Sequence, residues 1–215
     1  MPDREDDMSA APLSETEPLR SEPSVWDPLP DWVFPPERGF TADDLDRLHG
    51  IPPHTELIDG TLVFVSPQTN FHMSMLFLLE SELRRTVPGG LTVRREMTVT
   101  LGRRQRPEPD IMVVRADAVQ GPRQTTYRPQ DVVLAVEVVS PESEIRDRER
   151  KPRLYAESGI THFWLVENTD GEPSVHVYEL DRATTSYVPT GIHRGRLKLD
   201  VPFAIDIDLS QITRI

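Results

Sequence analysis

The residue whose position is hardest to explain by packing is Glu137, which lies inside the apolar run 132–139. This run is rich in β-branched residues and predicts a central strand buried on both faces. A carboxylate in such a strand is costly to bury unless it is paired with a cation or binds a metal. We therefore interpret Glu137 as a candidate site residue. The alternative is a structural carboxylate near the end of the strand that is solvated or paired with an arginine.

A second carboxylate, Asp110, opens the apolar stretch 110–114. Taken alone, an aspartate after Pro109 more often marks a turn or the start of a strand. If its strand pairs with the strand of Glu137, however, both carboxylates can lie at one end of the sheet on one face. Hard divalent cations such as Mg²⁺ prefer oxygen ligands of this kind. Such an ion can activate water and stabilise charge on a transferring phosphoryl group.

Two other charged residues could complete this site. Lys151 follows Glu137 by 14 residues and is one of only two lysines among 24 basic residues. Lysine is a compact point charge with a movable proton, and from a following helix it could stabilise developing negative charge. Glu56 precedes a predicted turn and could add a third carboxylate. Considered individually, both residues are better explained without a site, Lys151 as one cation within a charged segment and Glu56 as an acid at the edge of a hairpin.

The elements that must position these residues alternate between helices and strands, which predicts a mixed β-sheet flanked by helices. Asp59-Gly60 is a strong turn signal between apolar-alternating arms. Asn70 is the expected cap of the longest helix. Proline is disfavoured inside a helix, so Pro152 predicts a helix that starts or bends near Lys151. Proline also biases the residue before it, Lys151, away from helical dihedrals. We expect helices over 41–49, 70–87 and 144–158, a hairpin over 56–65, strands over 91–101, 110–114, 132–139 and 161–167, little regular structure over 115–131, and short strands with a last helical turn after 174.

Composition limits the classes of function. The net charge is −12, which argues against broad sequence-independent binding of nucleic acid. Seven arginines between residues 84 and 106 nevertheless leave room for a local basic surface, or for a solvated arginine-rich hairpin. The chain has no cysteine, no zinc-like histidine spacing, no Gly-Lys-Ser/Thr phosphate loop and no Gly-X-Ser-X-Gly elbow.

The N-terminal segment is acidic and rich in proline, with a net charge of −5 over residues 1–24. We interpret residues 1–39 as a disordered tail, with Trp26, Trp32 and Phe34 as side chains that could dock its end onto a domain over 40–215. Nothing approaches a membrane-spanning apolar stretch or a signal peptide, so we expect a cytoplasmic protein without membrane contact.

Several short motifs, in this order, resemble one family. They are Glu56-Leu57-Ile58-Asp59-Gly60, Ser66-Pro67 with His72, Pro109-Asp110-Ile111, Glu137-Val138-Val139-Ser140-Pro141, Asp147-Arg148-Glu149-Arg150-Lys151, Leu154-Tyr155-Ala156, Gly159-Ile160 and Phe163-Trp164-Leu165-Val166. The family is the large bacterial Uma-two family of restriction endonuclease-like proteins, within the PD-(D/E)XK nuclease superfamily. The resemblance extends from about Phe40 to Ile215.

The resemblance implies a restriction-endonuclease-like α/β (α+β) core with a Mg²⁺ site, where Mn²⁺ can substitute, at the end of the central strands. Asp110 and Glu137 match the two acids of the superfamily motif, and Glu56 matches an auxiliary acid. The usual lysine two residues after the second acid is absent, because Val139 stands there. Lys151 matches the lysine that this family carries on the next helix.

We therefore expect a Mg²⁺-dependent endonuclease acting on DNA, with Asp110, Glu137 and Glu56 as metal ligands and Lys151 beside the scissile phosphate. A homodimer is expected because cutting two strands favours two-fold symmetry. The first alternative is a catalytically inactive module of the same fold that binds nucleic acid or protein. The second is another chemistry of paired carboxylates, such as glycoside hydrolysis.

Overall fold

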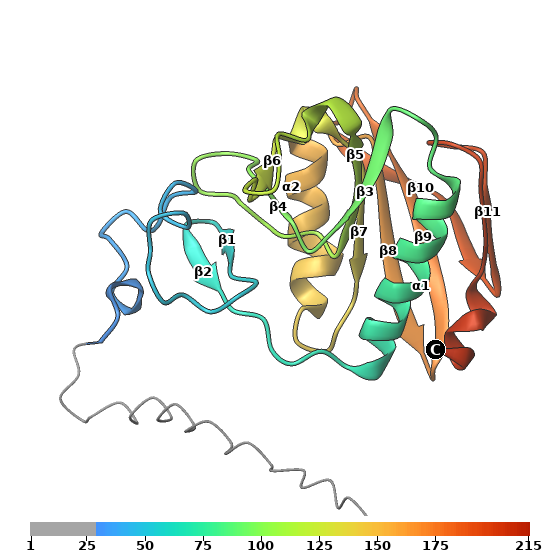
Figure 1. The fold of residues 1–215 in the computed structure, drawn as a ribbon, viewed down its shortest axis with the longest axis horizontal. Helices are drawn as coiled ribbons and strands as arrows, with labels where there is room; N and C mark the ends of the chain where they lie inside the picture. The colour runs from blue at the N-terminus through green and yellow to red at the C-terminus, as the bar shows by residue number, and fades with distance from the viewer. Residues whose placement is uncertain (1–28) are drawn as a thin grey trace, which may run out of the picture.

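The computed structural model describes residues 29–215, and its centre is a six-stranded sheet with the order β10-β9-β8-β7-β5-β3 (Figure 1). Strands β7 and β8 are parallel, and every other neighbouring pair in this sheet is antiparallel. The predicted mixed sheet is therefore confirmed. The strands of this sheet are β3 (Leu91–Arg95), β5 (Ile111–Arg115), β7 (Val132–Val138), β8 (His162–Thr169), β9 (Glu172–Asp181) and β10 (Ser186–Arg194).

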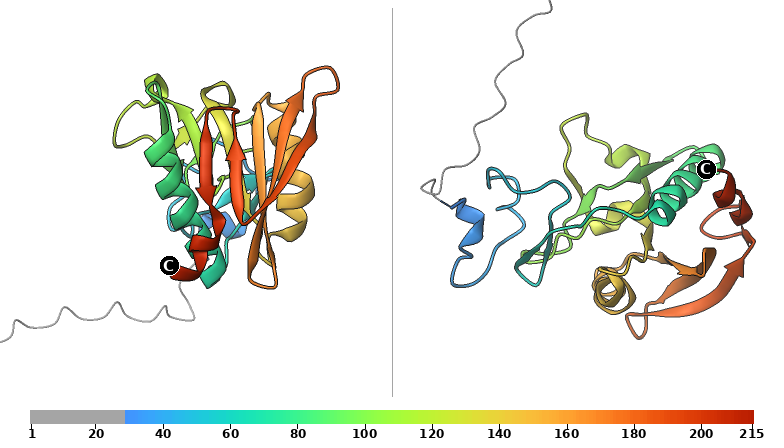
Figure 2. Two further views of the ribbon diagram at one scale, coloured as in Figure 1. Left: turned by 90° about the vertical axis from the view of Figure 1, so that its right-hand side faces the viewer. Right: turned by 90° about the horizontal axis from the view of Figure 1, so that it is seen from below.

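Helices cover both faces of the sheet, as Figure 2 shows. On one face lie α1 (Asn70–Thr86), the hairpin of β11 (Arg196–Leu199) and β12 (Ile205–Asp208), and the terminal turn η5 (Leu209–Arg214). On the other face lies α2 (Lys151–Glu157). Because side chains alternate along a strand, Val136 and Val138 of β7 enter the core beneath α1, while Ala135 faces α2. The same alternation directs Glu137 toward α2.

Helix α1 confirms the longest predicted helix, with its cap one residue earlier than expected. The N-cap is Thr69, whose hydroxyl accepts a hydrogen bond from the backbone N–H of His72 at 3.2 Å. Capping satisfies one of the backbone donors that the first turn leaves without a helical partner. The cap therefore fixes the first turn of α1, which carries His72.

The helical segment before β8 accommodates Pro152 because it changes from a π-helical turn to an α-helix just before this residue. Residues Arg146–Arg150 form a π-helical turn, η4, and α2 begins directly after it. Pro152 then stands in the first turn of α2, where a backbone N–H is not needed for the helix. The expectation that Pro152 biases Lys151 away from helical dihedrals is wrong, because Lys151 has φ −61° and ψ −45°.

A small lobe projects from the side of the sheet and is built around the predicted hairpin (Figure 1). We call residues 29–65 the hairpin lobe. Its antiparallel strands are β1 (Glu56–Ile58) and β2 (Thr61–Val63). Asp59 and Gly60 between them have φ values of +55° and +80°, as a type I′ turn requires. Trp32, in the 3₁₀ turn η1 (Asp31–Val33), packs edge-on against Phe64 with ring centroids 5.3 Å apart.

Replacing Gly60 with alanine should lower the free energy of unfolding by about 1–3 kcal/mol, because a side chain is strained at positive φ. An added Cβ would also lie 2.5 Å from Nη2 of Arg104, so that guanidinium would have to leave the turn. Urea denaturation measures the change. Gly89→Ala is the matched control, since Gly89 has no positive φ and open space around it. An equal loss in both variants would contradict the role given to the turn.

Other sequence expectations need correction. No regular helix forms over 41–49, where the chain makes only turns. The physical reason is tertiary: the carbonyl of Ala42, which a helix would use for its own ladder, accepts a hydrogen bond from Arg106 Nη1 at 3.0 Å. The carboxylate of Asp44 accepts hydrogen bonds from the backbone N–H and the hydroxyl of Thr41 at 2.7 and 2.8 Å.

The strand expected over 91–101 is split at Glu96, whose φ is +50°. β3 ends at Arg95, and β4 (Thr98–Val99) instead pairs with β6 (Thr126–Tyr127) in a separate parallel pair. The segment 115–131 therefore contains a short strand besides its two 3₁₀ turns, η2 (Ala116–Ala118) and η3 (Pro129–Asp131). Strands β9 and β10, with ten and nine residues, are longer than the short strands expected there.

The predicted tail falls mainly on residues 1–28, which lie outside the described residues, as does Trp26. The boundary between tail and domain therefore stays a prediction. Of the two other side chains expected to dock, Trp32 also donates a hydrogen bond to the carbonyl of Gly50 at 3.1 Å, while Phe34 is exposed. Among the described residues, no helix is long and apolar enough to cross a membrane.

Candidate functional site

Asp110 and Glu137 are brought together by the pairing of β5 with β7. In this antiparallel pair Ile111 lies opposite Val136, so Asp110, directly before β5, lies beside Glu137 near the end of β7. One oxygen of Asp110, Oδ2, accepts a hydrogen bond from the backbone N–H of Val138 at 2.6 Å. The two acids therefore lie at one edge of the sheet, held by the backbone of the strand that carries Glu137.

Lys151 lies at the centre of three carboxylates. Its Nζ is 2.9 Å from Glu56 Oε1, 3.0 Å from Glu137 Oε2 and 3.2 Å from Asp147 Oδ1. All four residues are buried, with exposed fractions of 5 % or less. The structure thus brings together Glu56 from β1, Glu137 from β7, and Asp147 and Lys151 from the helical segment before β8. Asp110 lines the same cleft.

This cluster has an excess of negative charge. Burial, together with repulsion from Asp147, Asp110 and Glu56, raises the pKa of Glu137 well above its usual range, although Lys151 opposes this shift. Burial likewise raises the pKa of Asp147. Burial would lower the pKa of Lys151, but its three carboxylate neighbours outweigh that effect and raise it. The lysine is therefore a firmly held cation within a set of carboxylates that one lysine does not neutralise.

Glu137 has a further partner that sequence reasoning missed. The hydroxyl of Tyr155 donates a hydrogen bond to Glu137 Oε1 at 2.5 Å, and Tyr155 is fully buried. Burial, followed by the charge of Glu137, raises the pKa of this phenol well above its usual range. Asp147, Lys151 and Tyr155 are spaced four residues apart, so a helical projection would have placed all three on one face.

His72 lies in the first turn of α1 and also faces the site. Its Nε2 is 3.2 Å from Asp110 Oδ1, while its buried Nδ1 has no hydrogen-bond partner among residues 29–215. His72 Nε2 and the backbone of Val138 therefore contact the two different oxygens of Asp110.

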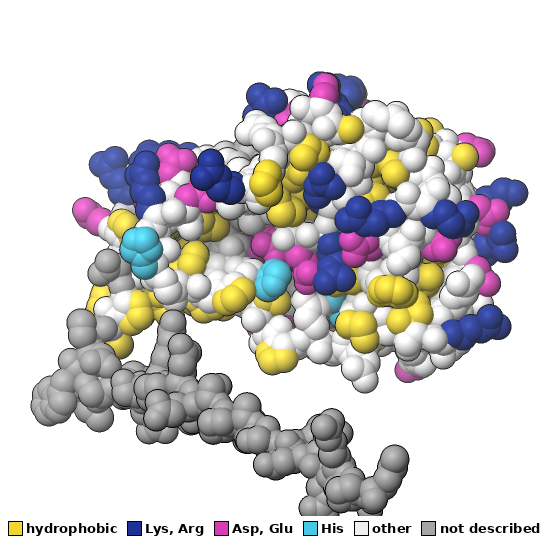
Figure 3. Space-filling view, viewed as in Figure 1, with side chains coloured by type: hydrophobic (Ala, Val, Ile, Leu, Met, Phe, Trp, Pro, Cys, Tyr) yellow, Lys and Arg dark blue, Asp and Glu magenta, His cyan; other side chains and the backbone are white. Residues whose placement is uncertain are grey.

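The cleft that contains these groups is small. Its volume is about 60 Å³, and its walls include Glu56, Asp110, Glu137 and Lys151. This is room for a few water molecules or a hydrated ion, so a nucleotide would reach the site only at the cleft mouth. In the space-filling view, acidic side chains gather in the hollow beside the hairpin lobe, with basic side chains on either side (Figure 3).

A histidine-carboxylate pair lies on the wall of this cleft, with His54 Nδ1 2.5 Å from Glu108 Oε1. The hydrogen bond to Glu108 raises the pKa of His54, although partial burial opposes the shift. A histidine with a raised folded-state pKa stabilises the fold fully below its unfolded value of about 6.5. That contribution disappears as the pH rises through the folded-state value.

His54→Gln should therefore reduce the free energy of unfolding at pH 6 but have little effect at pH 8.5. The difference at pH 6 should stay below about 1 kcal/mol, because His54 is half-exposed and solvent screens the pair. Chemical denaturation at both pH values measures it. His49→Gln is the control, since His49 is exposed and has no carboxylate in ion-pairing distance among the described residues. A larger effect at pH 8.5 would contradict the assignment.

The donor set suits a hard divalent cation. The acids that converge here offer only oxygen atoms, and their charge exceeds that of Lys151. Within residues 29–215, no three acidic or histidine side chains already stand in a metal-coordinating arrangement. The space between Glu56, Glu137 and Asp147 is filled by Nζ of Lys151. Asp110, which makes no contact with the lysine and is more exposed than those three acids, is accessible from the cleft.

The arginines between residues 84 and 106 do not form one continuous basic surface. Arg106 is buried and pairs with Asp46 at 2.8 Å, and Arg94 donates to the hydroxyl of Tyr127 at 2.9 Å. Arg84 pairs with Glu80 on the surface of α1. The expected local basic surface is therefore reduced to a subset of these residues, which includes Arg103 and Arg104 beside the hairpin lobe.

Comparisons with known proteins agree with this architecture. The crystal structure of a putative nuclease belonging to DUF820, from Anabaena variabilis, superposes with a TM-score of 0.62 at 17 % sequence identity. The match covers 81 % of this chain and 98 % of that one, and it shows a shared fold. No curated protein sequence gives a significant match. The model of the Uma2 family, described as "Putative restriction endonuclease", matches residues 42–210, and the chain belongs to this family.

Proposed function

We propose that this protein is a Mg²⁺-dependent endonuclease that hydrolyses phosphodiester bonds in DNA, with Mn²⁺ as a substitute ion. The observation that carries the proposal is the convergence of Glu137 with Lys151 at 3.0 Å, beside Asp110, at one edge of the sheet. Two acids and a lysine in a small buried cleft provide cation ligands together with a fixed positive charge. Membership of the Uma2 family supports the same reaction class.

Asp110 and Glu137 would hold the ion, with Glu56 assisting directly or through water. A divalent ion bound there would supply positive charge to the phosphate oxygens and favour ionisation of the attacking water. His72 and the backbone of Val138 orient Asp110, and Tyr155 orients Glu137. Fixed orientation matters because a displacement of about 1 Å can cost a hundredfold in rate.

Lys151 would provide a positive charge that is already in position before the substrate arrives. Its pKa is raised, so it stays protonated and acts as an electrostatic group rather than as a base. With Glu56, Glu137 and Asp147 around it, its ammonium is held by three elements of the fold. A group fixed in this way stabilises charge at the phosphate without a reorganisation cost. We include a two-fold homodimer in the proposal, because cutting both strands favours that symmetry.

The test is incubation of the full chain with supercoiled plasmid DNA across a titration of Mg²⁺ or Mn²⁺. We expect nicked and then linear DNA in the presence of either ion and none with excess chelator. Calorimetric titration of the protein with Mn²⁺ reports metal binding independently of cleavage. Absence of cleavage with both ions, together with retained DNA binding, would replace this proposal with that of a catalytically inactive DNA-binding module.

A further inference from the structure

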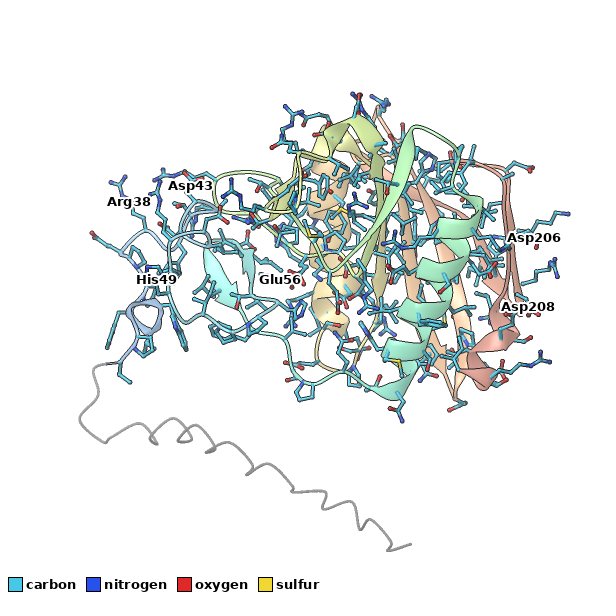
Figure 4. The ribbon with its side chains drawn as sticks, viewed as in Figure 1. Arg38, Asp43, His49, Glu56, Asp206 and Asp208 are labelled. Carbon is cyan, nitrogen blue, oxygen red and sulfur yellow. The ribbon has the colours of Figure 1, made fainter. Side chains whose placement is uncertain are left out.

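Three arginines surround a hollow on the hairpin lobe that the catalytic contacts do not use. The hollow has a volume of about 300 Å³ and is lined by Arg38, Gly39, Thr41, Arg103 and Arg104. Figure 4 shows Arg38 at the outer part of the lobe, while Glu56 lies on its inner side toward the sheet. The hollow and the catalytic cleft therefore share one small lobe but have no lining residue in common.

Backbone hydrogen bonds hold together the two segments that carry these arginines, one around Arg38 and the other at Arg103-Arg104. The carbonyl of Arg103 accepts from Ala42 N–H at 2.8 Å, and that of Arg104 accepts from Gly60 N–H at 3.0 Å. The carbonyl of Gly60 in turn accepts from Phe40 N–H at 2.8 Å. Segments far apart in sequence are thus fixed around the hollow by main-chain contacts, independently of where the arginine side chains point.

The arginine side chains are available for an anion. Arg104 Nη2 donates to the carbonyl of Asp59 at 2.6 Å, which leaves its remaining N–H groups for other partners. Arg38 and Arg103 donate no side-chain hydrogen bond to residues 32–215. Over the same residues, no carboxylate lies within 4.0 Å of any of the three guanidinium groups.

Two acids feel the charge of these arginines, but both have other partners. The pKa of Asp59 is lowered mainly by a hydrogen bond from Arg150, and Arg104 makes only a smaller contribution. The pKa of Asp44 is lowered mainly by hydrogen bonds from Thr41, and Arg103 makes only a smaller contribution. The Asp44 carboxylate is thus engaged by the turn that it caps. Three like charges around one hollow repel one another, and a bound anion would relieve that repulsion. Planar guanidinium groups match the oxygens of phosphate in particular.

We propose that this hollow binds a backbone phosphate of the DNA outside the catalytic cleft. The inference rests on the proposed function. Arg104 precedes Asp110 by six residues, which limits the distance between their Cα atoms to about 20 Å. At about 3.4 Å per nucleotide along one strand, the contacted phosphate lies within roughly six nucleotides of the scissile one.

The surface view supports simultaneous contact. Basic side chains gather over the hairpin lobe on the face whose centre contains the acidic hollow (Figure 3). A duplex crossing this face would present its scissile phosphate to the cleft and a flanking phosphate to the arginines. Such a contact positions the duplex without reading its sequence.

The experiment compares two double variants of the full chain, each with the same change in charge. One is Arg38→Ala with Arg103→Ala; the other, on the β10 edge of the sheet, is Arg182→Ala with Arg194→Ala, both exposed. Binding of a labelled 24-base-pair duplex is measured in chelator as a function of salt. Thermal unfolding confirms that both variants keep the fold.

We expect the Arg38/Arg103 variant to raise Kd at least fivefold at about 0.1 M salt. The slope of log K against log salt should fall by about one for each phosphate that the variant no longer neutralises. In cleavage, its KM should rise while kcat is kept. The Arg182/Arg194 variant should change each quantity less than twofold.

Equal effects in the two variants would show that DNA binding depends only on the net charge of the protein, and would overturn the inference. Unchanged affinity and salt slope in the Arg38/Arg103 variant would also overturn it, while metal-dependent cleavage by the same protein would leave the proposed function standing. A wild-type chain that neither binds nor cleaves the duplex would reject both. Asp110→Asn gives the opposite signature, in which the duplex is still bound but is not cleaved.

Discussion

Replacing Asp110 with asparagine should lower the rate of Mg²⁺-dependent DNA cleavage by about a thousandfold while the protein remains folded. A divalent ion at a phosphoryl-transfer site contributes several kcal/mol of charge stabilisation, and about 4 kcal/mol corresponds to a factor of a thousand. The neutral amide removes the charge that would hold the ion. Its oxygen can still accept the hydrogen bond that Val138 N–H donates to Asp110 Oδ2.

Plasmid nicking at saturating Mg²⁺ measures this effect, and Mn²⁺ calorimetry should show weaker binding in the same variant. Asp117→Asn is the matched control, because Asp117 is an exposed aspartate that pairs with Arg115 and does not line the cleft. Its activity should equal that of wild type. If Asp110→Asn cleaves as fast as wild type, the cleavage does not depend on this carboxylate and the proposed site is wrong.

Replacing Lys151 with methionine should lower the free energy of unfolding by about 3–5 kcal/mol at pH 7, and it should abolish cleavage. Removing one partner from a buried ion pair leaves the others as uncompensated buried charges. In this site the carboxylates left behind are Glu56, Glu137 and Asp147. Methionine has a similar length, so the loss is chiefly one of charge rather than of packing.

The stability defect of this variant should shrink as the pH falls. The pKa of Glu137 is raised in the folded protein, and the pKa of Asp147 is raised as well. A carboxyl group whose folded-state pKa exceeds its unfolded value destabilises the fold above that folded-state pKa. The penalty is relieved as the pH falls and the group takes up its proton.

Urea denaturation between pH 5 and pH 8 measures this trend. Lys198→Met is the control, because Lys198 is the only other lysine and lies exposed on β11. Its stability should change by less than about 0.5 kcal/mol. Adding Glu137→Gln to Lys151→Met should recover part of the lost stability. A defect that stays constant with pH and is not reduced in the double variant would show that the lysine acts through packing.

Elements that depend on local residue patterns could be predicted from the amino-acid sequence. The apolar run around Glu137 predicted a central strand, and β7 lies between β5 and β8. Asp59-Gly60 predicted the β1-β2 turn, because the positive φ of both residues is a property of the dipeptide. The same pattern singled out Glu137 as an anomalous buried acid, and this residue is indeed 1 % exposed.

Predictions from local sequence patterns failed in two situations. In one, a distant segment binds a backbone group or pairs with a strand; in the other, a helix contains a π-helical turn. The carbonyl of Ala42 is engaged by Arg106, so residues 41–49 form turns instead of a helix. The strand after β3 turns away at Glu96 to pair with a segment about 28 residues further along the chain. A π-helical turn precedes Pro152 and keeps Lys151 helical, which rules for an ordinary α-helix do not anticipate.

The meeting of the charged residues in one site depends on long-range packing. The sequence supplied Glu56, Asp110, Glu137 and Lys151 as candidates, but the distance between residues far apart in sequence depends on strand register and on helix placement. The pairing of β5 with β7 sets Asp110 beside Glu137, and the helix packed on that face brings in Lys151. The roles of Tyr155 and His72 became visible only then, because each consists of a contact with a residue on another element. Asp147 pairs with Lys151 one helical turn further along the chain, so the helical spacing alone could have indicated it.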